Sequence, residues 1–114
     1  MKKYAETAIK AAELIVSGSD PESAWEKASC IVFIPNSTSQ KKGCPKNAFL
    51  ALYGVKTKGK NATYALNALH YLKNNPAKSI TEDELWDIAL DGEQKTYNSQ
   101  MAVVLALWEA GYLK

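Results

Sequence analysis

The chain contains no arginine. All 14 of its basic residues are lysines, set against 12 acidic residues in a length of 114. Arginine grips phosphates and guanine edges with paired hydrogen bonds, so its absence argues against a protein that reads DNA sequence. The longest apolar stretch, Met101 to Trp108, is far shorter than the roughly 20 residues that span a bilayer. We therefore expect neither specific DNA reading nor a membrane partner.

Cysteine and histidine are also scarce. Cys30, Cys44 and His70 cannot complete a four-ligand zinc site by themselves, and we expect no metal and no cofactor. The first residues are basic, but no apolar run follows them as in a signal peptide. The sequence therefore predicts a cytoplasmic protein with both thiols reduced.

The apolar residues recur with helical spacing. With 46% hydrophobic and 23% charged residues, the composition is that of one globular domain over residues 1–114. We expect an all-α bundle of five or six helices. They cover residues 3–17, a segment from Ser19 to Pro35, another from Pro45 to Gly54, about 61–74, a helix opened by Thr81, and one from about Asn98 to Gly111. The run 31–34 could instead form a short strand, because β-branched and aromatic residues dominate it.

The sequence also predicts where two of these helices begin and which of their residues are buried. Ser19 with Glu22, and Thr81 with Glu84, fit the capping-box pattern. The expected buried positions include Trp25, Ala28, Ile31 and Val32 in the second helix, Ala62, Ala65, Leu66, Leu69 and Leu72 in the fourth, and Leu85, Trp86 and Ala89 in the fifth.

The last helix carries two apolar stripes. Met101, Val104, Leu105 and Trp108 form one, and Val103, Leu107 and Ala110 form the other. A helix that is apolar on two sides belongs in the centre of a bundle. The last two helices also suggest a helix-turn-helix-like pair, although the connection 91–97 is long for such a turn.

Charge is strongly segregated along the chain. Between Lys27 and Thr81 there are nine lysines and no acid, whereas residues 82–93 contain six acids and no lysine. Either the two blocks create a two-sided surface field, or they face each other and neutralise. The sequence leaves both arrangements open.

The segment 41–60 is the candidate site for an anion. Hydroxyl groups, lysines and a helix start would together favour a phosphate or carboxylate, or the loop hydroxyls could simply satisfy the loop's own backbone. The candidate ligand-binding residues are Ser39, Lys41, Lys42, Gly43, Cys44, Lys46, Lys58 and Lys60. Residues 54–61 also approach the phosphate-binding P-loop pattern, but Asn61 replaces its Ser or Thr and the preceding segment reads as helix.

Cys44 is the candidate catalytic residue. We expect it to cap the helix that begins at Pro45, close to Lys41, Lys42 and Lys46. A helix N-terminus and nearby cations stabilise a thiolate, although a small structural residue would fit the same position. His70 could act as its base if the two residues meet in the fold.

Three segments together resemble a family of small, uncharacterised bacterial proteins. They are Ala24 to Ala28, Ser39 to Lys46 and Asn98 to Trp108. The resemblance spans most of the chain and implies a bacterial, cytoplasmic, single-domain protein. It carries no known activity, so it assigns no functional residue.

These observations favour a small binding module rather than an enzyme. Its expected partner is a phosphate-bearing ligand or a nucleic-acid backbone, bound weakly and without sequence preference. The alternative is an enzyme that uses Cys44 as a thiolate nucleophile beside Lys41 and Lys42. The pattern indicates no particular oligomeric state.

Overall fold

The structure is a computed structural model that describes residues 3–57, 59–97 and 99–113. Its six helices, α1 to α6, follow one another without a strand in the described residues. Their bounds are Lys3–Val16, Pro21–Val32, Gly43–Leu52, Asn61–Asn74, Glu82–Leu90 and Gln100–Glu109. The predicted all-α class and the number of helices are therefore confirmed.

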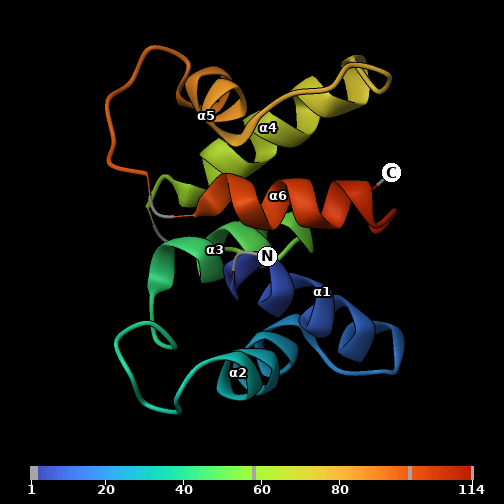
Figure 1. Ribbon diagram of the computed structural model, residues 1–114, viewed down its shortest axis with the longest axis vertical. Helices are drawn as coiled ribbons and strands as arrows, with labels where there is room; N and C mark the ends of the chain where they lie inside the picture. Colours follow the sequence, from blue (N-terminus) through green and yellow to red (C-terminus); the bar gives the residue numbers. More distant parts are fainter. Residues whose placement is uncertain (1–2, 58, 98, 114) are drawn as a thin grey trace.

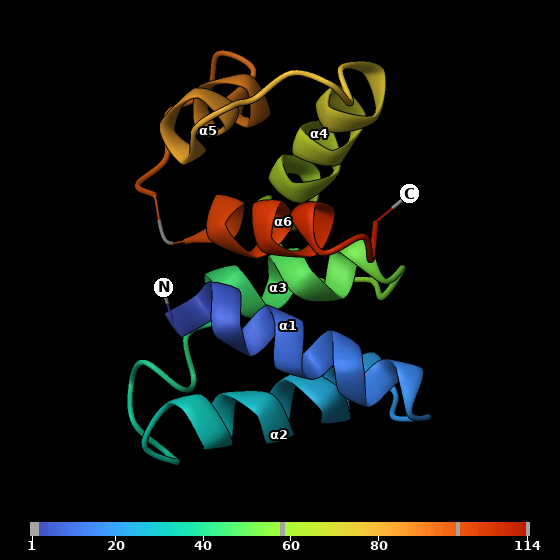
Figure 2. The ribbon, with the colours of Figure 1, turned by 45° about the vertical axis from the view of Figure 1, so that its right-hand side comes forward.

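Helices α1 and α2 form a hairpin at one end of the molecule (Figures 1 and 2). Gly18 makes the turn with φ of +114°, a conformation that L side chains rarely adopt. Asp20 caps α2 by accepting a hydrogen bond from the Ser23 amide at 3.1 Å. The predicted Ser19–Glu22 capping box is thus wrong by one position, because Asp20 occupies the N-cap and Pro21 the first helical position.

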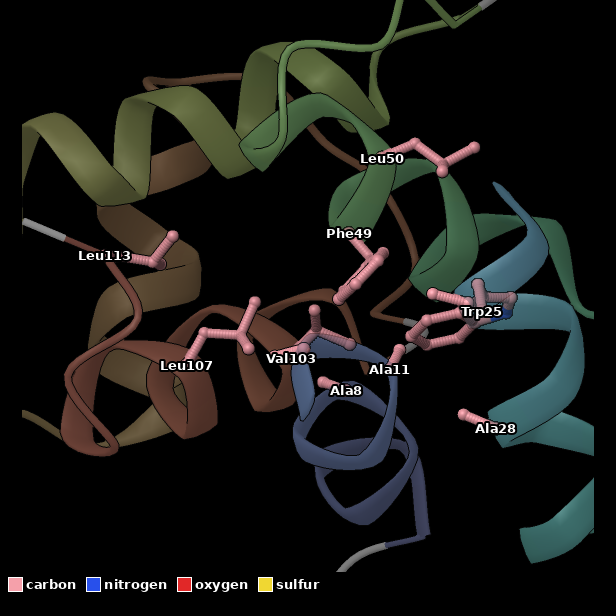
Figure 3. Packing of buried hydrophobic residues seen from close by; sticks show 11 residues of the cluster. Ala8, Ala11, Trp25, Ala28, Phe49, Leu50, Val103, Leu107 and Leu113 are labelled. Carbon is pink, nitrogen blue, oxygen red and sulfur yellow. The ribbon is translucent and has the colours of Figure 1, made fainter. Parts of the chain in front are cut away.

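Helix α6 lies between two clusters of buried side chains. Val103 and Leu107 join the cluster built on α1, α2 and α3, where Val103 lies between Ala8 and Phe49 (Figure 3). Met101 and Val104 join the cluster built on α4 and α5. The two stripes predicted for this helix therefore pack in different directions, and its central position is confirmed.

Some predicted core residues are exposed. Ile31 is 68% exposed and Leu66 is 48% exposed, whereas Tyr64 and Ala68 fill the buried face of α4. Ala110 is also exposed, because it follows the end of α6. The run 31–34 forms no strand, since α2 continues to Val32 and Phe33 is its C-cap.

The last two helices do not form a helix-turn-helix pair. Residues 91–99 connect them, which is much longer than the three- or four-residue turn of that motif. The first five residues of α6, Gln100 to Val104, are all buried. A helix whose first turns are buried in this way cannot place them in a DNA groove.

Candidate functional site: the N-terminus of α3

A buried glutamine holds the loop that leads into α3. The Gln40 side chain is only 4% exposed, and its amide donates to Ser29 Oγ at 2.9 Å and to Glu26 Oε2 at 3.5 Å. Its carbonyl oxygen accepts from the Asn36 amide at 3.2 Å, and its own backbone amide donates to Ser37 Oγ at 3.2 Å. These bonds fix the loop against α2. Nothing in the sequence indicates this role, because a single glutamine in a polar loop is expected to be exposed to solvent.

The hydroxyls of this loop are partly occupied by the loop itself. Ser37 Oγ accepts a hydrogen bond from the Gln40 backbone amide. This agrees with the alternative prediction that the loop hydroxyls satisfy the loop's own backbone. The carbonyl of Ser39 accepts the Tyr4 hydroxyl at 2.9 Å, which ties the loop to α1 as well. The loop is therefore anchored on two helices directly before the first turn of α3.

Helix α3 begins without a side-chain cap. Its N-cap is Lys42, which makes no side-chain hydrogen bond to the first turn. The helix starts at Gly43, two residues earlier than expected, so Cys44 lies inside the first turn instead of capping it. Lys41 and Lys42 are both exposed. The positive end of the helix dipole and two lysines therefore point to the same region of the surface.

Lys46 faces a mixed surface. It lines a shallow hollow of about 370 Å³ together with Glu22, Glu26 and Lys27 of α2. Two carboxylates and two ammonium groups nearly balance there. Lys46 therefore contributes less free positive charge than Lys41 and Lys42, which lie in the preceding loop.

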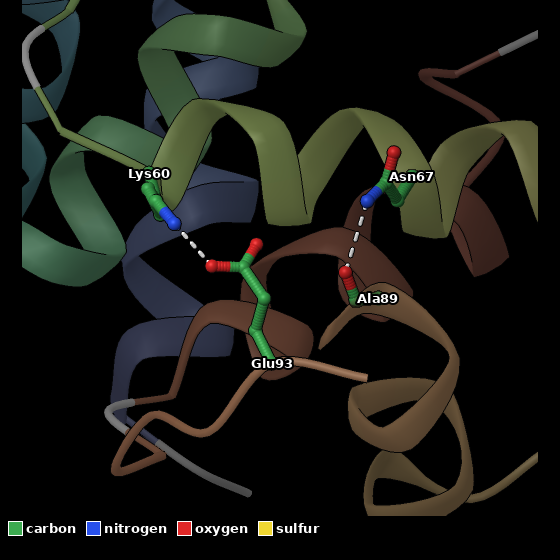
Figure 4. A network of polar contacts seen from close by, with 4 residues as sticks. All are labelled: Lys60, Asn67, Ala89 and Glu93. Atoms are coloured by element: carbon green, nitrogen blue, oxygen red, sulfur yellow. Dashed lines mark hydrogen bonds and ion pairs between the residues drawn. The ribbon is translucent and has the colours of Figure 1, made fainter. Parts of the chain in front are cut away.

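The far end of the basic segment meets the acidic block. The Lys60 ammonium forms an ion pair with the Glu93 carboxylate (Figure 4). The hydrogen bond to Glu93 and the negative charge of that carboxylate raise the pKa of Lys60. Lys56 is exposed, and Lys58, another predicted site residue, lies outside the described residues. The two charge blocks are thus joined at Lys60, while Lys41 and Lys42 stay exposed at the start of α3.

The near match to a P-loop has the wrong surroundings. Residues 54–61 follow helix α3, whereas a P-loop follows a strand. Lys60 is the N-cap residue of the next helix, α4, and its side chain makes no cap hydrogen bond. A phosphate-cradling P-loop needs a buried strand before it and a hydroxyl for the metal. The segment is a helix–helix connection.

Cys44 and His70 belong to different places in the fold. Cys44 is half-buried in the first turn of α3. His70 lies on α4, where its side chain pairs with Asn74 at 3.1 Å and lines a hollow with Asp91. In the described part of the chain, no hydrogen bond joins Cys44 to His70. Both cysteines are free thiols.

Tyr97 makes a bridge that the sequence did not reveal. Its hydroxyl donates to Glu82 Oε2 at 2.8 Å and accepts the Ala102 amide at 3.0 Å. It thereby caps α6, whose N-cap residue Ser99 makes no side-chain hydrogen bond to the helix. Burial, followed by the hydrogen bond to the Glu82 carboxylate, raises the pKa of Tyr97.

The described residues contain neither a cluster of metal-ligating side chains nor a membrane-spanning helix. No group of three or more His, Cys, Asp and Glu side chains there could hold a metal ion. None of the helices in those ranges is long and apolar enough to cross a membrane.

The chain belongs to a family of unknown function (DUF6979), whose model matches residues 1–114. No curated protein and no solved structure matches it. This agrees with the resemblance to an uncharacterised family, and it assigns no activity to any residue.

Proposed function

We propose that this member of the family is a small binding protein that takes an anionic partner at the start of α3. The site consists of Lys41 and Lys42, with the partly balanced Lys46 at its edge, and of the first-turn amides of Gly43 and Cys44; we call it the α3 lysine cluster. The observation that carries the proposal is the uncapped first turn beside two exposed lysines. Helix N-termini with neighbouring cations bind phosphate and carboxylate groups.

The chemistry of the cluster defines the class of partner. Lysine acts as a compact point charge and not as a planar fork, so it holds phosphate groups without selecting a base or a fixed geometry. A phosphate-bearing ligand or a nucleic-acid backbone, bound weakly, fits this description. Lys60 does not belong to the cluster, because Glu93 already neutralises it. The proposal places this binding in the bacterial cytoplasm.

A salt titration tests the proposal. Binding to short single- and double-stranded nucleic acids and to heparin should weaken steeply with salt, because displaced counterions drive the association. Changing Lys41, Lys42 and Lys46 together to Gln should weaken binding and reduce the salt slope by up to about three counterion units. The matched control changes Lys10, Lys73 and Lys95 to Gln, which removes the same charge elsewhere.

The control decides between a site and a general charge effect. Equal losses in the two triple variants would contradict the α3 lysine cluster. Absence of binding to all three polyanions at about 50 mM salt, where such contacts are strong, would remove the proposal altogether. A single change of Lys60 to Gln should leave binding unchanged.

A second candidate function rests on Cys44. The thiol lies in the uncapped first turn beside Lys42, and catalytic cysteines are found in such electropositive, partly exposed surroundings. Thiol titration of Cys30→Ser, which leaves only Cys44, tests it. Reaction well below the ordinary thiol pKa of about 8.5 favours the enzyme, and ordinary reactivity removes it.

A further inference from the structure

Helix α6 leaves one side uncovered. Helices α1, α3, α4 and α5 all pack against it, yet Figure 1 shows it at the front of the molecule with no further helix over it. There, α6 and α1 border a hollow of about 540 Å³, whose apolar lining includes Ile9, Leu105 and Ala106. Pockets of this size and character bind ligands or partner side chains.

The ridges and grooves of this surface have the spacing that allows another helix to pack on it. Leu105 and Glu109, four residues apart, line both this hollow and a neighbouring one of about 240 Å³. They therefore form a ridge between two depressions. Ala102, Ala106 and Ala110 lie along a parallel row in the larger hollow, where short side chains allow close approach. Helices pack by placing such ridges into such grooves, so the complementary shape is another helix.

The charged side chains that the structure describes around the larger hollow are of one sign. Among the described residues, its charged lining consists of two carboxylates, Glu82 and Glu109. Tyr97 bonds both Glu82 and the Ala102 amide, which places Glu82 near the start of α6. Ala102 and Glu109 are seven residues apart, or about 10 Å along a helix axis. The apolar floor thus has a carboxylate toward each end.

A matching helix would carry basic residues at the same spacing. Lysine or arginine side chains seven residues apart lie on one face, two turns from each other, with apolar side chains between them.

We propose that the groove between α1 and α6 binds a basic amphipathic helix of a partner protein. The apolar stripe of that helix lies across Leu105 and Ala106, and its basic residues meet Glu82 and Glu109. This surface is separate from the α3 lysine cluster and has the opposite charge. The interaction is a helix-in-groove recognition mode.

The test uses two synthetic helical peptides of about 15 residues, long enough to form an isolated helix. Both carry an apolar stripe of Leu and Ala between two charged positions that are seven residues apart. These two positions are Lys in one peptide and Glu in the other. In titrations followed by amide NMR, the Lys peptide should shift signals of residues 102–110 and 5–9, and the Glu peptide should not. Glu109→Lys should weaken binding of the Lys peptide about tenfold, because an attraction becomes a repulsion.

The matched control is Glu13→Lys, which makes the same charge change at an exposed position of α1 outside the groove lining. Glu109 is exposed as well, so both variants should fold normally, as circular dichroism will show. Equal binding of the two peptides, equal losses in the two variants, or no shift at residues 102–110 would each overturn the proposal. Self-association of the protein that shifts the same amides would also overturn it, by making a second copy the occupant.

Discussion

Replacing Tyr97 with Phe removes one oxygen atom that serves two helices. The hydroxyl accepts the Ala102 amide in the first turn of α6 and donates to the Glu82 carboxylate at the start of α5. The aromatic ring would stay in place against Trp86, whose ring centre lies 5.2 Å away. The substitution therefore isolates the hydrogen bonds from the packing.

The expected cost is that of leaving the Ala102 amide without its hydrogen-bond acceptor. Loss of a helix cap costs about 0.5–2 kcal/mol, and a buried donor left without a partner costs about 1–3 kcal/mol. Both describe the Ala102 amide, so they overlap and are not added. Glu82 stays partly solvated and regains water. We expect Tyr97→Phe to lower the free energy of unfolding by about 2 kcal/mol.

The same bridge predicts a dependence on alkaline pH. The pKa of Tyr97 is raised in the folded state, so the neutral phenol is favoured by folding. Its contribution is complete below the ordinary tyrosine pKa of about 10 and declines as the pH rises above that value. Part of the alkaline loss of stability should therefore disappear in Tyr97→Phe.

Urea unfolding followed by tryptophan fluorescence at neutral and alkaline pH measures both effects. Tyr71→Phe is the control, because the structure shows no hydrogen bond to its hydroxyl among the described residues. A Tyr97→Phe midpoint equal to that of the wild type, with the slope unchanged, would refute the bridge as a stabilising cap.

Three further substitutions test the fold by chemical denaturation. Thr81→Ala removes the side-chain half of the capping box with Glu84 and should cost about 1 kcal/mol. Hydrogen bonds from the Thr81 backbone amide and from its hydroxyl lower the pKa of Glu84. The variant keeps the first bond and loses the second, so part of this cost should disappear as the pH falls below about 4. Asp91→Gly relieves a left-handed residue with φ of 48° and should stabilise by about 0.5 kcal/mol, and a destabilised variant would contradict this. Trp108→Ala removes a ring that packs against both core clusters and should cost about 3 kcal/mol; an unchanged midpoint would contradict the central placement of α6.

The sequence predicted the helices well because their signals are local. Thr81 and Glu84 form the expected capping box, and the two stripes of α6 face two clusters. The prediction that Ile31 and Leu66 are buried is wrong. Periodicity identifies the apolar face of a helix, but not how far the neighbouring helices cover that face. Ile31 lies in the last turn of α2, where that face is no longer covered.

The candidate site was less predictable because it depends on contacts between distant residues. Lys41 and Lys42 are exposed beside a helix start, as the sequence suggested. The pairing of Lys60 with Glu93 spans 33 positions, and the Tyr97 bridge joins two helices. Charge segregation showed that such a pair was possible in principle, but only the fold selects which lysine is neutralised.

The most direct test of the α3 lysine cluster is an amide NMR titration with inorganic pyrophosphate. If an anion binds at the uncapped first turn of α3, the largest shifts will be those of the Gly43 and Cys44 amides, and they will vanish when Lys41 and Lys42 are changed to Gln. Helix α4 is the internal comparison, because its N-cap residue is also a lysine that makes no side-chain cap hydrogen bond, and that lysine, Lys60, is paired with Glu93. Shifts of equal size at the start of α4, or no localised shift at α3, would contradict the account.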